Sequence, residues 1–279
     1  MTRDATVRIS RLARYPVKSC GAEPLEVAEL GPAGVRLDRA LAVVVGDEVV
    51  TQRQHPGLAR VRPSLHDSSD GTLLRLGGAA ALGEVTAPVC ATGATRTVTI
   101  FGEPVEVVEQ APELSAWFSD VLRTEARLVM APASSRRRTP GVREGLTVLA
   151  DEATLSLHSQ ASLDELNTRL AARDHPPLPA DRFRANLVLD GCAAHAEDDA
   201  DRVEVGAAGE VVLGFAQLDP RCAVTTVDQQ AGRHDGPEPL RTLADYRRGP
   251  GGSVRFGVYL TVETPGTVRV GDPVVLRRS

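Results

Sequence analysis

The segment at residues 15–21 carries side chains that could hold an anion. Lys18 and Ser19 precede Gly21, where a run containing Pro16 gives way to a turn. An ammonium, a hydroxyl and backbone N–H groups in one turn can bind a phosphate. Lys18 is also the only lysine of the chain. An ordinary turn at the end of a strand accounts for the same residues, so this segment alone leaves both interpretations open.

A second segment, 181–191, offers a polar pair of a different kind. Arg184 and Asn186 alternate with apolar neighbours, so on a β-strand the arginine and the asparagine would share one face. Such a pair can hold a phosphate or a polar heterocycle. A surface strand is the competing interpretation, and the segment by itself does not choose between them.

A third segment, 219–228, places a thiol next to a positive charge. Cys222 follows Arg221 at the expected start of a strand over 223–227. The charge favours the thiolate, which is the form that binds a metal or attacks an electrophile, and soft thiolates suit transition metals. A single cysteine cannot hold a metal alone, so a metal here would have to bring most of its own ligands. The alternative is a small buried hydrophobe.

The rest of the sequence offers no comparable site. Its four cysteines form no CxxC pair and are expected as thiols, and its six histidines show no ligand spacing. There is no GxSxG, Walker A or HExxH motif, and no GxGxxG motif follows a strand. The acidic stretch 197–201 could bind a divalent cation, but a charged, solvated loop is the stronger expectation.

Composition indicates an ordinary soluble globular protein of one large or two modest domains. The chain has 279 residues, 42% of them hydrophobic, and a net charge of −5. An acidic balance argues against a broad surface for nucleic acid. No apolar run is long enough to span a bilayer, and residues 1–10, with Arg3, Asp4 and Arg8, lack the apolar core of a secretion signal. We therefore expect a cytoplasmic protein that contacts neither nucleic acid nor membrane.

The elements that must position these side chains are mostly short strands. Alternation and turn residues predict hairpins at 40–45 with 48–51 and at 97–100 with 105–108, a loop at 68–71 and an amphipathic helix at 112–123. The stretch 131–141, rich in Ser, Pro and Arg, reads as a linker. It divides the chain into a domain at 1–130 and a second domain at 131–279.

The second half predicts two helices among further strands. A helix at 162–172 begins with the capping box Ser162–Glu165, and a short helix covers 239–247. Strands are expected at 186–189, 202–205, 210–213, 223–227, 258–262 and 268–276, the last with a Gly-Asp-Pro turn. The fold class is therefore α+β, mainly β, with a barrel as its expected architecture.

The polar segments fall in a fixed order with two others. They read YPVKS at 15–19, LDR at 37–39, RFRANLVLDG at 182–191, RCAVTTVD at 221–228, and FGVY at 256–259 with PG at 265–266 and VGDP at 270–273. Together they resemble the MOSC proteins, a family named after the C-terminal part of molybdenum cofactor sulfurase. The similarity is closest to the mitochondrial amidoxime-reducing component and its bacterial relatives. It implies a MOSC β-barrel domain at 131–279, preceded by the family's β-rich N-terminal domain.

The resemblance also implies a molybdenum cofactor, with molybdenum bound by molybdopterin. It makes Cys222 the metal ligand and catalytic residue. Where the family often has a second cysteine this chain has Asp219, and where it often has a proline this chain has Ala185. The residues implied to bind the cofactor are Lys18, Ser19, Arg39, Asp151, Arg184, Asn186, Cys222 and Tyr259.

The implied activity is reduction of N-hydroxylated compounds by cleavage of the N–O bond, without pyridoxal phosphate. Because the sequence continues into no ferredoxin-like domain after residue 276, the electrons are expected from a separate ferredoxin- or flavoprotein-like partner. A second hypothesis needs the same pocket: a non-catalytic protein that carries molybdenum cofactor, or a sulfur atom on Cys222.

Overall fold

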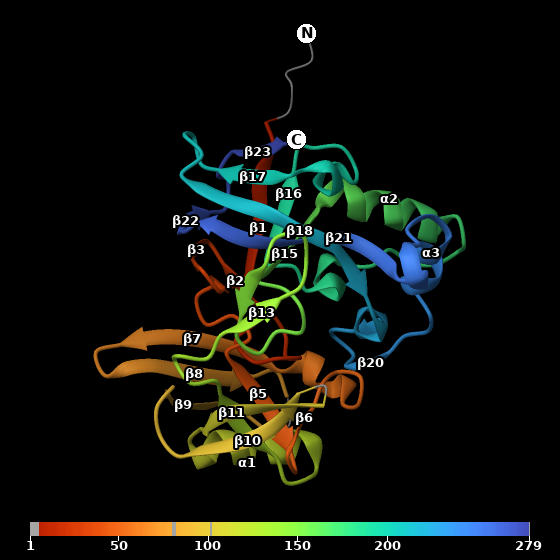
Figure 1. Cartoon of the computed structure of the whole chain (residues 1–279). Helices are drawn as coiled ribbons and strands as arrows, with labels where there is room; N and C mark the ends of the chain where they lie inside the picture. Colours follow the sequence, from red (N-terminus) through yellow and green to blue (C-terminus); the bar gives the residue numbers. More distant parts are fainter. Residues whose placement is uncertain (1–5, 80–81, 101, 279) are drawn as a thin grey trace.

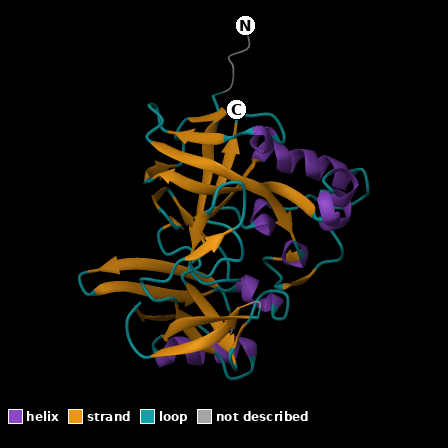
Figure 2. Ribbon diagram, in the orientation of Figure 1, coloured by secondary structure: helices purple, strands orange, loops and turns teal. Residues whose placement is uncertain are grey.

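The computed structural model describes residues 6–79, 82–100 and 102–278, and within them two β-rich bodies lie one above the other (Figure 1). Residues 1–5, with Arg3 and Asp4 of the segment considered above, lie outside this range. Strands dominate both bodies, and the few helices are short and peripheral (Figure 2). The expected fold class, α+β and mainly β with a barrel, is confirmed.

The upper body is built on an eight-stranded sheet. β15 and β16 pair in parallel, whereas the other neighbours in the sheet are antiparallel. Backbone hydrogen bonds join residues 7–9 to residues 271–274, so the sheet curls back toward β1. In order across the sheet, the strands are β2 (Glu23–Leu25), β1 (Arg8–Arg14), β16 (Leu187–Asp190), β15 (Leu155–Ser159), β21 (Val254–Thr264), β18 (Val211–Arg221), β17 (Arg202–Val205) and β23 (Val274–Arg277).

The lower body contains a closed five-stranded barrel with a helix against it. Both predicted hairpins are confirmed within this barrel, because β5 pairs with β6 and β10 pairs with β11, each antiparallel. The helix α1 (Pro112–Leu122) buries Leu114, Trp117 and Phe118, as its periodicity predicts. The barrel strands are β10 (Thr95–Ile100), β11 (Glu103–Glu109), β12 (Arg127–Met130), β5 (Leu41–Val45) and β6 (Glu48–Val49).

Smaller sheets complete the chain. The turn at 68–71, predicted only as a loop, closes a hairpin of its own between β7 and β8. The stretch 131–141 is not wholly a linker, since β13 pairs with β14. The strands are β22 (Gly266–Arg269), β3 (Val27–Gly31) and β4 (Gly34–Val35) in one sheet; β7 (Arg62–Ser68), β8 (Gly71–Gly77) and β9 (Val85–Val89) in another; and the pairs β13 (Arg137–Thr139) with β14 (Gly145–Thr147) and β19 (Val227–Asp228) with β20 (Arg233–His234).

The two helices of the second half pack beside β21 and against each other. They are α2 (Gln160–Ala171) and α3 (Leu240–Tyr246). The predicted capping box is wrong, because the N-cap is Ser159, whose side chain accepts a hydrogen bond from the backbone N–H of Ser162. Ser162 therefore lies inside the helix, where its hydroxyl serves another partner, as described below.

The first strands of the chain join the body that residues 131–278 mainly build. The chain then runs from β1 toward the barrel through residues 15–18, which lie beside residues 39–41. The N–H of Lys18 donates to the carbonyl of Leu41 over 2.7 Å, and the N–H of Arg39 donates to the carbonyl of Tyr15 over 2.8 Å. This pairing brings Lys18 and Arg39 together at the junction of the two bodies.

Candidate functional site

All eight residues implied to bind a cofactor line one cavity of about 140 Å³. They come from the strand-end turn at 15–21, the loop before β5, the loop after β14, the segment just before β16, the residue after β18 and the middle of β21. The predicted site residues are thus brought together by segments more than 200 residues apart. Their roles toward a ligand stay predictions.

Lys18 is held at the cavity by a carbonyl and a carboxylate. Its Nζ donates to the carbonyl oxygen of Leu149 over 2.9 Å and also bonds the carboxylate of Asp151. Burial lowers the pKa of Lys18, and Asp151 partly offsets this effect. Burial raises the pKa of Asp151, but the Lys18 ammonium and Arg53 more than reverse it, so the pKa lies below its usual value. A buried ammonium paired with an accessible carboxylate can exchange that partner for another anion.

Ser19 adds a turn of unusual conformation beside this ammonium. Its φ is +67°, in the left-handed region that non-glycine residues rarely adopt. The side-chain amide of Gln52 donates to the Ser19 carbonyl over 2.7 Å and fixes the turn. The turn predicted at 15–21 is therefore present, and both its polar side chains line the cavity.

Arg39 connects the two bodies at the cavity wall. Its guanidinium is paired with Asp38 and donates to the Asn186 side-chain oxygen over 3.1 Å and to the Arg184 carbonyl over 2.8 Å. Burial lowers the pKa of Arg39, but Asp38 outweighs this, so the pKa is raised and the group stays charged. The Asn186 side chain in turn donates to the carbonyl of Ala13 on β1 over 3.1 Å.

Arg184 does not lie on a strand with Asn186, so that expectation is wrong. β16 begins only at Leu187, and Arg184 has a left-handed φ of +55° where a 3₁₀ turn ends. Its guanidinium lies 4.4 Å from the centroid of the Tyr15 ring and donates to the Cys20 carbonyl over 2.7 Å. Burial lowers the pKa of Arg184, whereas the cation–π contact and the hydrogen bond to the carbonyl stabilise its charged form. The side chains of Arg184 and Asn186 both line the cavity, although neither residue lies on the β-strand whose alternation was expected to place them on one face.

Cys222 does not begin a strand either. It follows the last residue of β18 and caps a 3₁₀ turn at 223–226, which the sequence had predicted as a strand. The side chain of its neighbour Arg221 turns away to the carbonyls of Phe183 and Phe256, 2.7 Å from each. The positive group beside the thiol is instead Arg53, whose Nη2 lies 3.3 Å from the Cys222 sulfur. Sequence proximity pointed to the wrong arginine.

Asp219 forms a buried acidic group behind Cys222. The carboxylate is 1% exposed, accepts a hydrogen bond from Ser156 Oγ over 2.8 Å and pairs with Arg221 at 2.5 Å. Burial raises the pKa of Asp219 to about 6, although Arg221 and Ser156 act in the opposite direction. Burial also raises the pKa of Tyr259, and the nearby Asp219 raises it further. Asp219 can therefore hold a proton close to neutral pH.

The cavity as a whole favours an anionic ligand. Six basic side chains line it against three acidic ones, so it carries an excess of positive charge in a partly desolvated space. The basic residues are Lys18, Arg39, Arg53, Arg182, Arg184 and Arg221, and the acidic residues are Asp151, Glu152 and Asp219.

Sequence patterns alone do not identify two residues of the cavity, Arg53 and Asp219. Arg53 lies in a polar stretch without a recognisable motif, and only its distance to Cys222 reveals it. Asp219 drew attention only as a departure from the family pattern. For Asp219 a signal existed, because an acid inside the mostly apolar strand 211–221 must be paired or protonated if it is buried.

The acidic stretch 197–201 is not the solvated loop that we expected. Residues 196–199 form a 3₁₀ turn, and Glu197 is fully buried.

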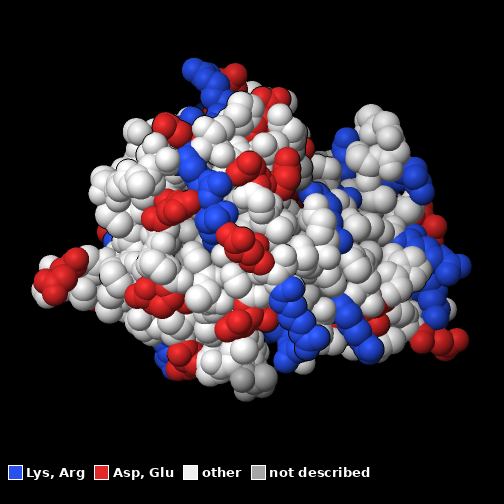
Figure 3. Space-filling model, turned by 90° about the horizontal axis from the view of Figure 1, so that it is seen from below, with Lys and Arg blue, Asp and Glu red and all other residues white. Residues whose placement is uncertain are grey.

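All four cysteines are free, as predicted. Acidic and basic side chains are interspersed on the face shown in Figure 3. Among the described helices, none combines the length and apolarity needed to cross a bilayer.

Comparisons with known proteins agree over nearly the whole chain. The family model for the MOSC N-terminal beta barrel domain matches residues 6–125, and that for the MOSC domain matches residues 145–275. Mitochondrial amidoxime-reducing component 1 of Mus musculus is 33% identical over 96% of this chain and 82% of its own length. Mitochondrial amidoxime reducing component 2 of Bos taurus is 32% identical over 95% and 82%. Molybdenum cofactor sulfurase of Oryza sativa subsp. japonica is 29% identical over 92% of this chain but only 33% of its own length.

Proposed function

This chain belongs to the MOSC family, and we propose that it binds a molybdenum cofactor in the cavity around Cys222 and reduces N-hydroxylated compounds. The proposal extends to this chain the activity that the names of its amidoxime-reducing relatives state. One observation carries it: a half-buried thiol, 3.3 Å from an arginine, opens into a cavity with an excess of positive charge.

The residues present suit such a cofactor. A molybdopterin brings sulfur ligands for the metal and a phosphate, so the protein needs one soft ligand and several cations. Cys222 offers the soft ligand, while Lys18, Arg39 and Arg184 offer the charges, with Ser19, Asn186 and Tyr259 as polar neighbours. The cavity volume of about 140 Å³ is smaller than a typical site for a drug-sized ligand. It would enclose the phosphate or the metal end, and the remainder would lie at the opening.

The Asp151 carboxylate occupies the position beside Lys18 for which an anionic ligand would compete. Its carboxylate pairs with Lys18 and lies 3.7 Å from Arg53, yet 41% of its side chain is exposed. A phosphate that displaces it would gain the buried Lys18 ammonium, and the carboxylate could turn toward water. Each charge-assisted hydrogen bond contributes about 1.5–3 kcal/mol.

When bound, the cofactor supplies two-electron redox chemistry at its metal. Cleavage of an N–O bond also consumes two protons and releases water. Asp219 can hold one of these protons on its carboxylate, since its pKa is raised to about 6. Arg221 and Ser156 fix its orientation, and Tyr259 lies beside it at the cavity wall. The protein's part is thus to orient the ligands, hold a proton and keep the site partly dry.

Electrons would come from a separate ferredoxin- or flavoprotein-like partner, and we propose that the protein acts in the cytoplasm. The competing function, a carrier of cofactor or sulfur, uses the same cavity. Turnover of an amidoxime with an added electron donor would support the reductase, and rapid transfer of the cofactor to an apo-acceptor without turnover would support the carrier. Cell fractionation tests the location.

Metal analysis of protein from a cofactor-producing host tests the cofactor proposal. The wild type should contain molybdenum and pterin in equal amounts. Cys222→Ser should lose activity, and Cys90→Ser, which changes an exposed thiol, should not. Wild-type protein without molybdenum and pterin would refute the proposal.

Lys18→Arg is the sharper variant of the same test. It keeps the charge, but the planar guanidinium cannot occupy the small space between Leu149 and Asp151 in the same way. Loss of one charge-assisted bond corresponds to roughly a 10- to 100-fold weaker cofactor affinity. Arg138→Lys, on β13 with an exposed side chain, serves as the control. Equal cofactor occupancy in Lys18→Arg and the wild type would show that Lys18 does not bind the cofactor.

A further inference from the structure

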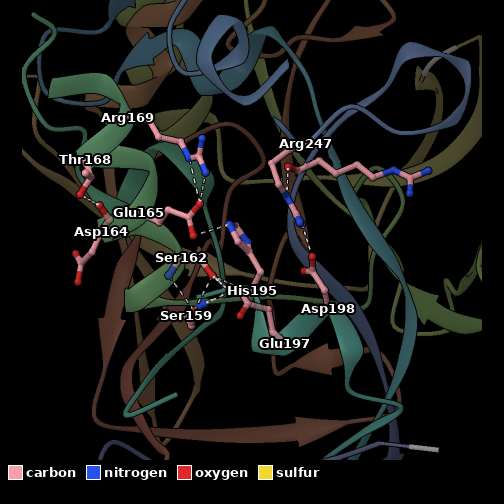
Figure 4. Close-up of polar contacts among 11 residues, drawn as sticks. Ser159, Ser162, Asp164, Glu165, Thr168, Arg169, His195, Glu197, Asp198 and Arg247 are labelled. Carbon is pink, nitrogen blue, oxygen red and sulfur yellow. Dashed lines mark hydrogen bonds and ion pairs between the residues drawn. The ribbon is translucent and has the colours of Figure 1, made fainter. Parts of the chain in front are cut away.

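A second group of polar side chains lies apart from the cavity, between the start of α2 and the 3₁₀ turn at 196–199 (Figure 4). His195, Glu197 and Asp198 each present a possible ligand atom, and these atoms lie within 4.8 Å of one another. None of the three residues lines the cavity around Cys222. The family motifs considered above do not include them.

Glu197 is the most telling member of this group. It is fully buried, and its Oε1 accepts hydrogen bonds from the N–H of Ser159 over 3.1 Å and from Ser162 Oγ over 2.6 Å. Its Oε2 is also buried but has no hydrogen-bond partner in the part of the chain that the structure describes. A buried carboxylate oxygen without a partner costs about 1–3 kcal/mol or more. The Oε1 contacts explain how the carboxylate is held in place, and they leave Oε2 available for something else.

Asp198 shows the same pattern as Glu197, with one oxygen paired and one unpartnered. It pairs through Oδ2 with Arg247, which follows α3, while its buried Oδ1 has no partner among the described residues. One ring nitrogen of His195, Nε2, faces Glu165 Oε2 at 3.8 Å, beyond hydrogen-bond distance. Both ring nitrogens are buried and have no hydrogen-bond partner within residues 6–79, 82–100 and 102–278. Figure 4 shows His195 between Glu165 on one side and Glu197 and Asp198 on the other.

We propose that His195, Glu197 and Asp198 bind one divalent transition-metal ion of the zinc type. A cation among them would provide a partner for a vacant atom on each of the three side chains. Two carboxylates balance its charge of +2, and one imidazole with two carboxylates leaves a fourth position for water. The imidazole selects against Mg²⁺ and Ca²⁺, which take oxygen ligands.

Two of the three outer contacts already have the form that metal sites use, and the third, from Glu165, lies at 3.8 Å. A ligating histidine usually gives its other ring N–H to a carboxylate, and ligating carboxylates are themselves hydrogen-bonded. Here Glu165 faces His195, Arg247 holds Asp198, and Ser162 holds Glu197. Ligand atoms around tetrahedral zinc lie roughly 3.3 Å apart, so the three side chains must close by about 1.5 Å at most.

The bound ion would act as a structural link. It would connect the 3₁₀ turn at 196–199 to α2 through Ser159 and Ser162, and to the end of α3 through Arg247. The His195 ring also packs edge-on against Tyr246 of α3, with the centroids 5.9 Å apart. These contacts would join the turn, α2 and α3 around one ion, whose fourth position is taken by water.

Zinc binding by the untagged full-length chain tests the proposal. The protein carries Cys222→Ser, so that the thiol of the cavity does not bind zinc, and it is stripped with a chelator before titration with zinc chloride alone. We expect one equivalent of Zn²⁺ and a concentration-dependent rise in melting temperature, with no such rise in excess Mg²⁺. Cobalt(II) should give the visible absorption of a four-coordinate ion.

Variants separate the site from adventitious binding. His195→Gln should weaken zinc affinity at least 100-fold, and Glu165→Gln roughly 10- to 100-fold as a loss of an outer contact. His66→Gln, a change of an exposed histidine, should have no effect. These changes avoid Glu197, whose contacts hold the fold together. Absence of zinc binding, or equal binding by His195→Gln and the parent, would overturn the proposal. Molybdenum content plays no part in this result, so it stands or falls independently of the proposed function.

Discussion

Replacement of Asp219 by asparagine should remove a specific pH dependence of stability. Asp219 is buried, and its pKa is raised from 3.8 to about 6, chiefly because burial penalises the charged form. The folded protein therefore binds a proton at Asp219 more tightly than the unfolded chain does. This stabilisation is fully present below pH 3.8 and is lost as the pH rises through about 6.

The size of the effect follows from the shift. A change from 3.8 to about 6 corresponds to about 3 kcal/mol of unfolding free energy. Roughly half of this is lost between pH 5 and pH 8. Because asparagine does not titrate, the stability of Asp219→Asn relative to the wild type should rise by about 1.5 kcal/mol over that range. The difference between the two proteins matters here, since other titrating groups cancel in it.

Urea denaturation of the cofactor-free proteins at four pH values between 5 and 8 measures this difference. Asp70→Asn, at the exposed tip between β7 and β8, is the matched control and should run parallel to the wild type. If the stability difference for Asp219→Asn stays constant within about 0.3 kcal/mol, then Asp219 is already ionised at pH 5. In that case it could not serve as the proton donor proposed above.

Three further predictions concern the surroundings of the cavity. Gly257→Ala should destabilise the protein by more than about 2 kcal/mol, because φ is +73° and an added Cβ would lie 2.4 Å from the Leu157 carbonyl oxygen; an unchanged melting temperature would contradict this. Ser159→Ala should cost about 1 kcal/mol in urea denaturation by removing the N-cap bond to the Ser162 N–H. The unfolding free energy of His158→Leu relative to the wild type should rise by about 3 kcal/mol as the pH falls from 7 to 4. Burial lowers the pKa of His158 to about 4, so in the wild type the unfolded chain gains the proton before the folded protein does. A flat difference over that range would mean that His158 has the same pKa in the folded protein as in the unfolded chain.

Local signals in the sequence predicted most elements well. The hairpins in the barrel and the helix α1 follow from alternation, turn residues and periodicity, which act between neighbours in the chain. The strand predicted at 223–227 failed for the same reason. A β-branched run there has strand propensity, but hydrogen bonds from Thr225 to Cys222 and from Thr226 to Ala223 fold it into a 3₁₀ turn instead.

The sequence also predicted which residues belong to the candidate site, but it did not predict which of them contact each other. The family resemblance named eight side chains, and all eight line one cavity. Which arginine lies beside Cys222 depended on the return of the chain through residues 50–54, which brings Arg53 and not Arg221 to the sulfur. Likewise, the acidic stretch 197–201 is hydrophilic in sequence, yet Glu197 is buried because it accepts bonds from Ser159 and Ser162.

The family, the mainly β class and the identity of the polar groups that meet at the cavity can be read from the amino acids alone. Which of these groups touch, which are buried and which hold protons depends on the folded arrangement of the chain. The physical reason is range: propensity and turn chemistry act over a few residues, whereas contacts and desolvation depend on segments far apart in the chain. The pKa of Asp219, the pairing of Arg53 with Cys222 and the vacant oxygen of Glu197 all arise from such contacts.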